Sequence, residues 1–204
     1  MMRTVVLASG AGTNFEAVLL AIASGGITNC EICGLIVDRK DSGAAKIASR
    51  GNIPVTTVDH KLFQNRSEFD SALFDAVILH KPELVLALGF MRVLSKSMIE
   101  RFPNRIINIH PSLLPAFPGL HAVRQALEYG ARVTGVTVHF VDASVDTGPI
   151  IAQKAVPIPE GSSVESLLPI IHREEHSILT EVVNLFCNGQ IAVDGRKVTL
   201  LSKD

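Results

Sequence analysis

The sequence predicts an α/β protein whose mostly parallel, twisted sheet carries helices on both faces. From residue 3 to residue 130, short β-branched runs alternate with stretches of helical spacing, an order typical of parallel sheets. Two further β-rich runs, over 133–141 and 149–156, are joined by a link too short for a crossover helix, so they should pair antiparallel. A chain of 204 residues can bury one sizeable core. We therefore expect a single Rossmann-like domain over 1–204, with antiparallel strands toward its C-terminal part.

The alternating part contains five expected strands and five expected helices. Each strand is a short run rich in Val, Ile and Leu, and each helix has apolar residues at helical spacing. The strands are expected over 3–8, 31–37, 54–58, 84–88 and 105–110. The helices are expected over 15–24, 42–50, 66–79, 95–101 and 121–129. Gly25, Gly51 and Gly130 follow three of these helices and are suited to ending them.

The last part of the chain predicts one long helix and a closing hairpin. The helix is expected over 163–187, and Pro169 predicts an interruption within it. Its polar cluster over 172–176 is consistent with a solvated face alone. The hairpin is expected over 191–193 and 197–201, around the Asp194-Gly195 turn.

A glycine-rich turn, S-G-A-G-T-N over 9–14, connects the first strand to the first helix. Free backbone N–H groups at a helix start favour an anion such as phosphate. The dinucleotide fingerprint fails because Phe15 stands where a small residue is needed, and the P-loop pattern fails because no Lys follows. Thr13 and Asn14 could cap the helix or donate to an anion. The turn therefore predicts either a phosphate site or an ordinary tight turn with an N-cap.

Two polar side chains, Asn108 and His110, end the fifth expected strand. They are two residues apart, so an extended chain directs them to the same side. Ligands bind at the carboxyl edge of parallel sheets. A single histidine after a buried strand is more often structural than catalytic. An amide that can donate to a developing oxyanion, beside an imidazole that can exchange a proton, nevertheless suits attack on a carbonyl.

Composition and charge exclude several classes of protein. The formal net charge is -1, and 47% of the residues are hydrophobic, which is ordinary for a soluble globular protein. No basic excess indicates a nucleic-acid partner, and no apolar run is long enough to span a membrane. The apolar stretch at the start of the sequence is too short to be a signal peptide. We expect a cytoplasmic protein with neither a nucleic-acid nor a membrane partner.

The three cysteines predict neither a disulfide framework nor a metal site. An odd number fits a reducing compartment. Cys30 and Cys33 form a C-x-x-C pattern, but it lies in an expected strand, where residues three apart point to opposite faces. No second pair follows, and Cys187 is far away in the sequence. We therefore expect core or edge thiols, and no bound metal.

Several motifs together resemble a known family. Two long stretches resemble the phosphoribosylglycinamide formyltransferases, which are folate-dependent enzymes of purine synthesis. They are I-N-I-H-P-S-L-L-P-A-F-P-G-L-H over 107–121 and V-H-F-V-D-A-S-V-D-T-G-P-I-I over 138–151. Three shorter motifs also occur in the order found in that family: L-A-S-G-A-G-T-N over 7–14, G-F-M-R-V-L over 89–94 and E-E-H over 174–176. The resemblance covers essentially the whole chain.

The resemblance implies a reaction and a catalytic trio. The formyl group of 10-formyltetrahydrofolate, a co-substrate, would pass to the primary amine of glycinamide ribonucleotide, and no metal is implied. The trio would be Asn108, His110 and Asp146. Asn108 and His110 would donate to the oxyanion, and Asp146 would orient His110 and favour its protonated form. His110 or a water held by Asp146 would carry the proton.

The resemblance also implies binding residues for both substrates and a division of the domain. Residues 1–100 would form a phosphate-binding Rossmann-like half, and residues 101–204 a catalytic and folate-binding half. The residues implied for glycinamide ribonucleotide are Gly12, Thr13, Asn14, Pro111 and Glu175. The residues implied for folate are Arg66, Met91, Arg92, Val93, Leu94, Asn108, Val141, Asp142, Ala143 and Asp146. Asp142 and Asp146 also fit ordinary turn chemistry, and Ala11 and Ala116 are departures that each remove a possible anion contact.

Three rival functions share this fold. A methionyl-tRNA formyltransferase would show R-G after S-L-L-P-x-x and a basic C-terminal domain. A formyltetrahydrofolate hydrolase would carry an N-terminal regulatory domain, whereas here the expected sheet starts at residue 3. A non-catalytic folate- or nucleotide-binding module would have no reason to keep the whole trio. We expect a monomer or a homodimer.

Overall fold

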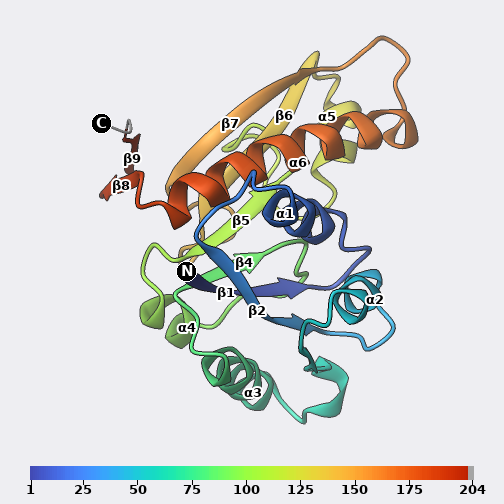
Figure 1. Ribbon diagram of the computed structural model, residues 1–204. Coiled ribbons are helices and arrows are strands. Elements are labelled where there is room, and N and C mark those ends of the chain that lie inside the picture. Colours follow the sequence, from blue (N-terminus) through green and yellow to red (C-terminus); the bar gives the residue numbers. More distant parts are fainter. Residues whose placement is uncertain (202–204) are drawn as a thin grey trace.

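The computed structural model describes residues 1–201 and has a seven-stranded sheet at its centre (Figure 1). The strands are β1 (Met2–Ala8), β2 (Cys30–Val37), β3 (Val55–Thr57), β4 (Leu84–Ala87), β5 (Ile106–His110), β6 (Val133–Phe140) and β7 (Ile150–Pro157). Their order across the sheet is β3-β2-β1-β4-β5-β6-β7. The contacts among β1 to β5 are parallel, whereas β5 pairs with β6, and β6 with β7, antiparallel. The predicted fold class is confirmed.

Helices cover both faces of this sheet (Figure 1). The helices are α1 (Thr13–Ala23), α2 (Gly43–Arg50), α3 (Arg66–Leu79), α4 (Lys96–Arg101), α5 (Ala122–Tyr129) and α6 (Val164–Cys187), with a short 3-10 helix η1 (His60–Leu62). Successive residues of β1 point to opposite faces, so Val6 packs into a core with α1, α2, α5 and α6. Val5 and Leu7 pack into a second core with α3 and α4. Two apolar cores on the two faces explain why the inner strands read as continuous hydrophobic runs.

Two expectations about the helices are wrong. Gly12 is the N-cap of α1 in a left-handed conformation, with φ of 83°, and no side chain caps the helix. Neither Thr13 nor Asn14 has the predicted capping role, because both lie in the first turn of α1. Helix α6 also runs through Pro169 without interruption. The N–H that proline lacks would have reached the carbonyl of Glu165 in the exposed first turn of the helix, so the loss is tolerated.

The C-terminal segment forms the predicted hairpin. β8 (Ile191–Asp194) and β9 (Lys197–Leu200) pair antiparallel as a separate two-stranded sheet. The cysteines lie in or beside the core, as predicted: Cys30 and Cys187 are buried and Cys33 is partly buried. Although Cys187 is far from Cys30 in the sequence, both residues belong to the core that α6 covers. No helix in residues 1–201 combines the length and apolar character needed to cross a bilayer.

The strand order opens the sheet at one point of its carboxyl edge. From β1 the chain proceeds to β2 and β3 on one side, and then returns to β4 and β5 on the other. The connections after β1 and after β4 therefore diverge, which leaves a crevice outside the ends of these strands. The glycine-rich turn, the 89–94 segment and the end of β5 all meet at this edge.

Candidate active site

A cavity of about 900 Å³ occupies the crevice at the carboxyl edge of the sheet. Its wall comes from the turn after β1, the exit of β4, the end of β5, the loop after β6 and one face of α6. The predicted site residues in this wall are Gly12, Thr13, Asn14, Met91, Arg92, Val93, Leu94, Asn108, His110, Pro111, Val141, Asp142, Asp146 and Glu175. Arg66 and Ala143 do not line it. The fold thus brings together most of the residues that the sequence singled out.

Asn108 and His110 are placed by the pairing of β5 with its neighbours. Asn108 is the cross-strand partner of His139, and His110 is the partner of Thr137 on β6. The two side chains share a face because they are two residues apart on a strand. The His110 ring is almost fully buried, with 6% of its side chain exposed. Both polar groups are therefore held by the sheet rather than by a loop.

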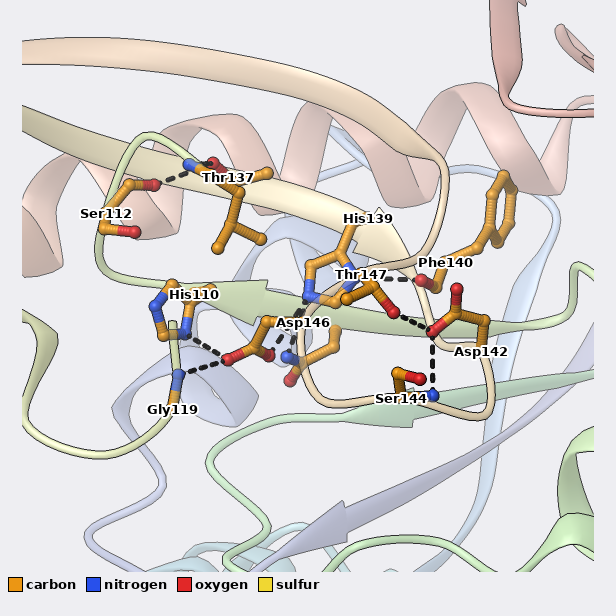
Figure 2. Close-up of polar contacts among 12 residues, drawn as sticks. His110, Ser112, Gly119, Thr137, His139, Phe140, Asp142, Ser144, Asp146 and Thr147 are labelled. Carbon is orange, nitrogen blue, oxygen red and sulfur yellow. Dashed lines mark hydrogen bonds and ion pairs between the residues drawn. The ribbon is translucent and has the colours of Figure 1, made fainter. Parts of the chain in front are cut away.

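Asp146 reaches this site from the loop between β6 and β7, and its backbone is left-handed, with φ of 55°. Figure 2 shows its carboxylate directed toward His110 and the backbone of Gly119. The Gly119 N–H donates to Oδ2 at 2.7 Å, and Nδ1 of His110 lies 3.3 Å from the same oxygen. Oδ1 lies 3.6 Å from Nε2 of His139. The predicted convergence of Asp146 on His110 is present in the structure.

Asp142, in contrast, forms the turn that shapes the loop. Its Oδ1 accepts from the Ser144 N–H at 3.2 Å and from the Thr147 hydroxyl at 2.6 Å (Figure 2). This arrangement is ordinary turn chemistry, which the sequence had left open for both aspartates. Asp142 therefore has the turn role, because it closes the loop, whereas Asp146 faces the histidines of the site.

The environment of Asp146 favours its ionised form. Burial by itself would raise the pKa of this carboxyl. The contact with His139, the hydrogen bond from the Gly119 backbone and the nearby imidazole of His110 outweigh that effect and hold the pKa below its ordinary value. A carboxylate is therefore present at neutral pH.

Both ring nitrogens of His110 are engaged. Nε2 lies 2.8 Å from the Phe117 carbonyl oxygen, and Nδ1 faces the Asp146 carboxylate. A carbonyl oxygen and a carboxylate oxygen only accept hydrogen bonds. The doubly protonated, cationic ring is therefore the form that satisfies both contacts at once.

His139 is a site residue that the sequence analysis missed. It lies one strand away from Asn108, with its side chain only 2% exposed, and it contacts both Asn108 and Asp146. Its position in the sequence could have identified it, because a histidine here stands in an apolar strand just before the loop that carries Asp146. The Phe117 carbonyl and the Gly119 N–H were also missed, because backbone groups leave no side-chain signal.

The glycine-rich turn faces a buried carboxyl on α6. Asn14 donates from Nδ2 to Glu175 Oε2 at 3.2 Å, while Asn14 Oδ1 is buried without a partner among residues 1–201. Burial raises the pKa of Glu175 to about 7, against the opposing effect of the Asn14 hydrogen bond. The expectation of a solvated face over 172–176 holds for Arg173, which is 73% exposed, but is wrong for Glu175.

The opposite end of the cavity has an apolar, exposed rim. Met91 and Val93 are both more than half exposed, at 58% and 53%. Arg92 contacts His60, with Nη2 2.8 Å from Nε2, and the Nε atom of Arg92 is buried without a partner in the described chain. Arg66 instead pairs with Asp70 at 2.7 Å and donates to the Val93 carbonyl, so it supports the rim from outside.

The cavity combines an anion-binding turn, a buried carboxyl, a histidine–aspartate pair and an apolar rim. No group of three or more His, Cys, Asp or Glu side chains in residues 1–201 is arranged to hold a metal ion. The site can present an amide N–H and an imidazolium to a carbonyl oxygen and a carboxylate to a proton. It is suited to acyl transfer between two bound molecules.

Comparison with known proteins gives a consistent result. The formyl transferase family model matches residues 2–183. The chain is 42% identical over 198 residues to phosphoribosylglycinamide formyltransferase of Mycobacterium tuberculosis, covering 97% of this chain and 91% of that protein. It is 37% identical over 196 residues to the enzyme of the same name from Bacillus subtilis, covering 94% and 100%. The crystal structure of glycinamide ribonucleotide transformylase 1 from Symbiobacterium toebii superposes with a TM-score of 0.95 at 46% identity, over 99% of this chain and 95% of that one.

Proposed function

We infer that this chain, which belongs to the formyl transferase family, transfers the formyl group of 10-formyltetrahydrofolate to the amine of N1-(5-phospho-D-ribosyl)glycinamide in purine biosynthesis. The products are the N-formyl ribonucleotide and tetrahydrofolate. The observation that carries this proposal is the Asp146 carboxylate beside His110, in one cavity with Asn108. A protein that only bound folate would not need an ionised carboxylate held against a buried imidazole.

Asn108 is the proposed ready donor to the reacting formyl group. The substrate amine attacks the formyl carbon, and negative charge develops on the formyl oxygen. An amide N–H aimed at that oxygen stabilises the charge, and one such donor is worth about 3 kcal/mol in the transition state. His110 adds a second donor once its contact with the Phe117 carbonyl or with Asp146 opens. This order follows from the engagement of both His110 nitrogens.

Asp146 and His110 together are the proposed proton-handling pair. The attacking amine must lose a proton, and the leaving folate nitrogen must gain one. The Asp146 carboxylate can only accept, so its contact with His110 keeps a hydrogen on Nδ1 of that ring. Either His110 itself or a water held by Asp146 can carry the proton between the two nitrogens. In both routes the carboxylate must be ionised, and its lowered pKa supports this.

The two ends of the cavity suit the two substrates. We propose that Gly12, Thr13 and Asn14 hold the phosphate of the ribonucleotide at the start of α1, and that Pro111 and Glu175 contact the rest of that substrate. Folate would lie against the apolar rim. Its proposed binding residues are Met91, Arg92, Val93, Leu94, Asn108, Val141, Asp142 and Asp146, with Arg66 and Ala143 acting from outside the cavity wall.

The whole chain, 1–204, is proposed to work as one formyltransferase domain in the cytoplasm, as a monomer or homodimer. Residues 1–100 would supply the phosphate-binding half, and residues 101–204 the catalytic and folate-binding half. The continuous seven-stranded sheet supports this arrangement, because β1 to β4 belong to the first half and β5 to β7 to the second.

Substrate dependence tests the proposal. Purified protein should release tetrahydrofolate from 10-formyltetrahydrofolate only when glycinamide ribonucleotide is present, with the N-formyl product formed in equal amount. Equal rates with and without the ribonucleotide would identify a formyltetrahydrofolate hydrolase instead. Binding of the folate without any turnover would identify a non-catalytic module.

A further inference from the structure

His139 is a buried ring in the cavity wall to which the proposed reaction assigns no role. The residue is 1% exposed, and its Nε2 atom faces both Asn108 and the carboxylate of Asp146. Figure 2 shows the ring on β6, above Asp146 and apart from His110. A polar ring at such a depth needs partners for both nitrogens. Its partners determine which nitrogen carries hydrogen.

The contact of Nδ1 fixes the tautomer of a neutral His139. Nδ1 lies 2.8 Å from the carbonyl oxygen of Phe140. A carbonyl oxygen only accepts, so Nδ1 must carry a hydrogen. In the neutral ring Nε2 then has a free lone pair and acts as an acceptor.

This acceptor faces the amide of Asn108. Nε2 lies 3.1 Å from Asn108 Nδ2, and the two residues are direct cross-strand partners. The amide nitrogen carries two hydrogens: one bonds to His139, and the second is available to the cavity. If the Asn108 amide were reversed, its oxygen would face the lone pair of Nε2, two acceptors would repel each other, and no N–H would point into the cavity. Neutral His139 therefore selects one of the two amide orientations.

We propose that His139 is a positioning residue that keeps the Asn108 N–H turned toward the formyl oxygen, a role that rests on the proposed formyl transfer. The titratable groups nearest to it are Asp146, with Oδ1 3.6 Å from Nε2, and His110 on the far side of that carboxylate. A protonated His139 would donate from Nε2 to Asp146 and repel the Asn108 N–H. The Asn108 contact, at 3.1 Å, is within hydrogen-bonding distance, whereas the Asp146 contact, at 3.6 Å, is too long for a hydrogen bond, so Asn108 is the partner of Nε2.

Two substitutions at position 139 test this role. His139→Leu removes the acceptor, whereas His139→Gln keeps an acceptor oxygen and cannot take up a proton. The expected result is a kcat about tenfold lower for the Leu variant, the scale of one hydrogen bond, with KM for both substrates unchanged within about twofold. The Gln variant should recover most of the loss. Equal losses in the Leu and Gln variants would overturn the proposal.

A double-mutant cycle separates positioning from structural support. If His139 acts through Asn108, then His139→Leu should lower kcat by less than about twofold in an Asn108→Ala background. Val138→Ala, a packing change at the next residue of β6, is the control: its effect should be the same in both backgrounds. If His139→Leu lowers kcat by the same factor in the Asn108→Ala background as in wild type, the proposed role is contradicted. A wild-type protein without ribonucleotide-dependent transfer would contradict the proposed function instead.

The tautomer can be measured without any substrate. In the ¹⁵N spectrum of histidine-labelled protein, neutral His139 should give the signature of hydrogen on Nδ1, assigned by its loss in His139→Gln. Hydrogen on Nε2 of the neutral ring would overturn the inference whatever the activity of the variants. Circular dichroism of each variant checks that the fold is kept.

Discussion

Nδ1 of His110 lies 3.3 Å from Oδ2 of Asp146, and the same oxygen accepts the Gly119 backbone N–H at 2.7 Å. The histidine stands at the end of a strand, whereas the aspartate is 36 residues later in a loop. Because Gly119 belongs to the segment that follows β5, Asp146 also fastens its own loop to that segment. The carboxylate therefore has two effects, one on the charge of the ring and one on the loop.

Asp146→Asn separates these two effects. The amide oxygen can still accept from Gly119, so the loop and the fold should be kept, but the negative charge beside His110 is lost. We expect kcat to fall by about 10²-fold or more, the scale of losing acid–base help. Steady-state kinetics and circular dichroism check the result, with Glu160→Gln as an exposed carboxyl control away from the site. A kcat within twofold of wild type would remove Asp146 from the mechanism.

Gly12 is required by its backbone and by its neighbour. Its φ of 83° is unfavourable for other residues, and a Cβ there would lie 2.7 Å from Cα of Ala44 on α2. We expect Gly12→Ala to lower the free energy of unfolding by about 2 to 4 kcal/mol and to weaken binding of the ribonucleotide phosphate.

Gly10→Ala is the matched control for that substitution. It adds the same methyl group two residues away, where no atom lies within 4 Å of the new Cβ. Its unfolding free energy should stay within about 0.5 kcal/mol of wild type. Similar urea midpoints for the two variants would show that the contact with Ala44 does not matter.

The two arginines near the apolar rim should differ in their effect on folate. Arg92 lines the cavity with a buried, unpartnered Nε among the described residues, whereas Arg66 only holds the Val93 carbonyl from outside. We expect Arg92→Ala to raise KM for 10-formyltetrahydrofolate by about tenfold to 100-fold, the scale of one charge-assisted hydrogen bond. Arg66→Ala should raise it by no more than about threefold. Equal effects would mean that Arg66 contacts folate directly.

The fold was predictable because local patterns and the global arrangement agree. Val6 and Leu7 belong to a run that is apolar throughout, and such runs alternate with helical spacing up to Gly130. The antiparallel end was predictable because the link after β6 is too short for a helix. Pro169 misled because the rule against proline in helices is weak near an exposed first turn.

The site was predictable only in part, for physical reasons. Asn108 and His110 are neighbours on one strand, so their shared face follows from strand geometry. His139 meets them only through the β5–β6 register, which no local pattern specifies. The burial of Glu175 likewise depends on α6 packing against α1, and its charged neighbours made it look like part of a solvated face.

The buried carboxyl of Glu175 predicts a dependence of stability on pH. Its pKa is raised from 4.5 to about 7, so the folded state binds this proton more tightly than the unfolded chain. Stability from this group is therefore fully present below about pH 4.5 and is lost as the pH rises through about 7. Glutamine cannot ionise, so the free energy of unfolding of Glu175→Gln should rise by up to about 3 kcal/mol relative to wild type between pH 4 and pH 8.

Urea unfolding at several pH values measures this difference, with the exposed Glu181→Gln on the same helix as the control. If the difference between Glu175→Gln and wild type stays flat with pH, the pKa of this carboxyl is the same in the folded and the unfolded protein, and burial does not raise it.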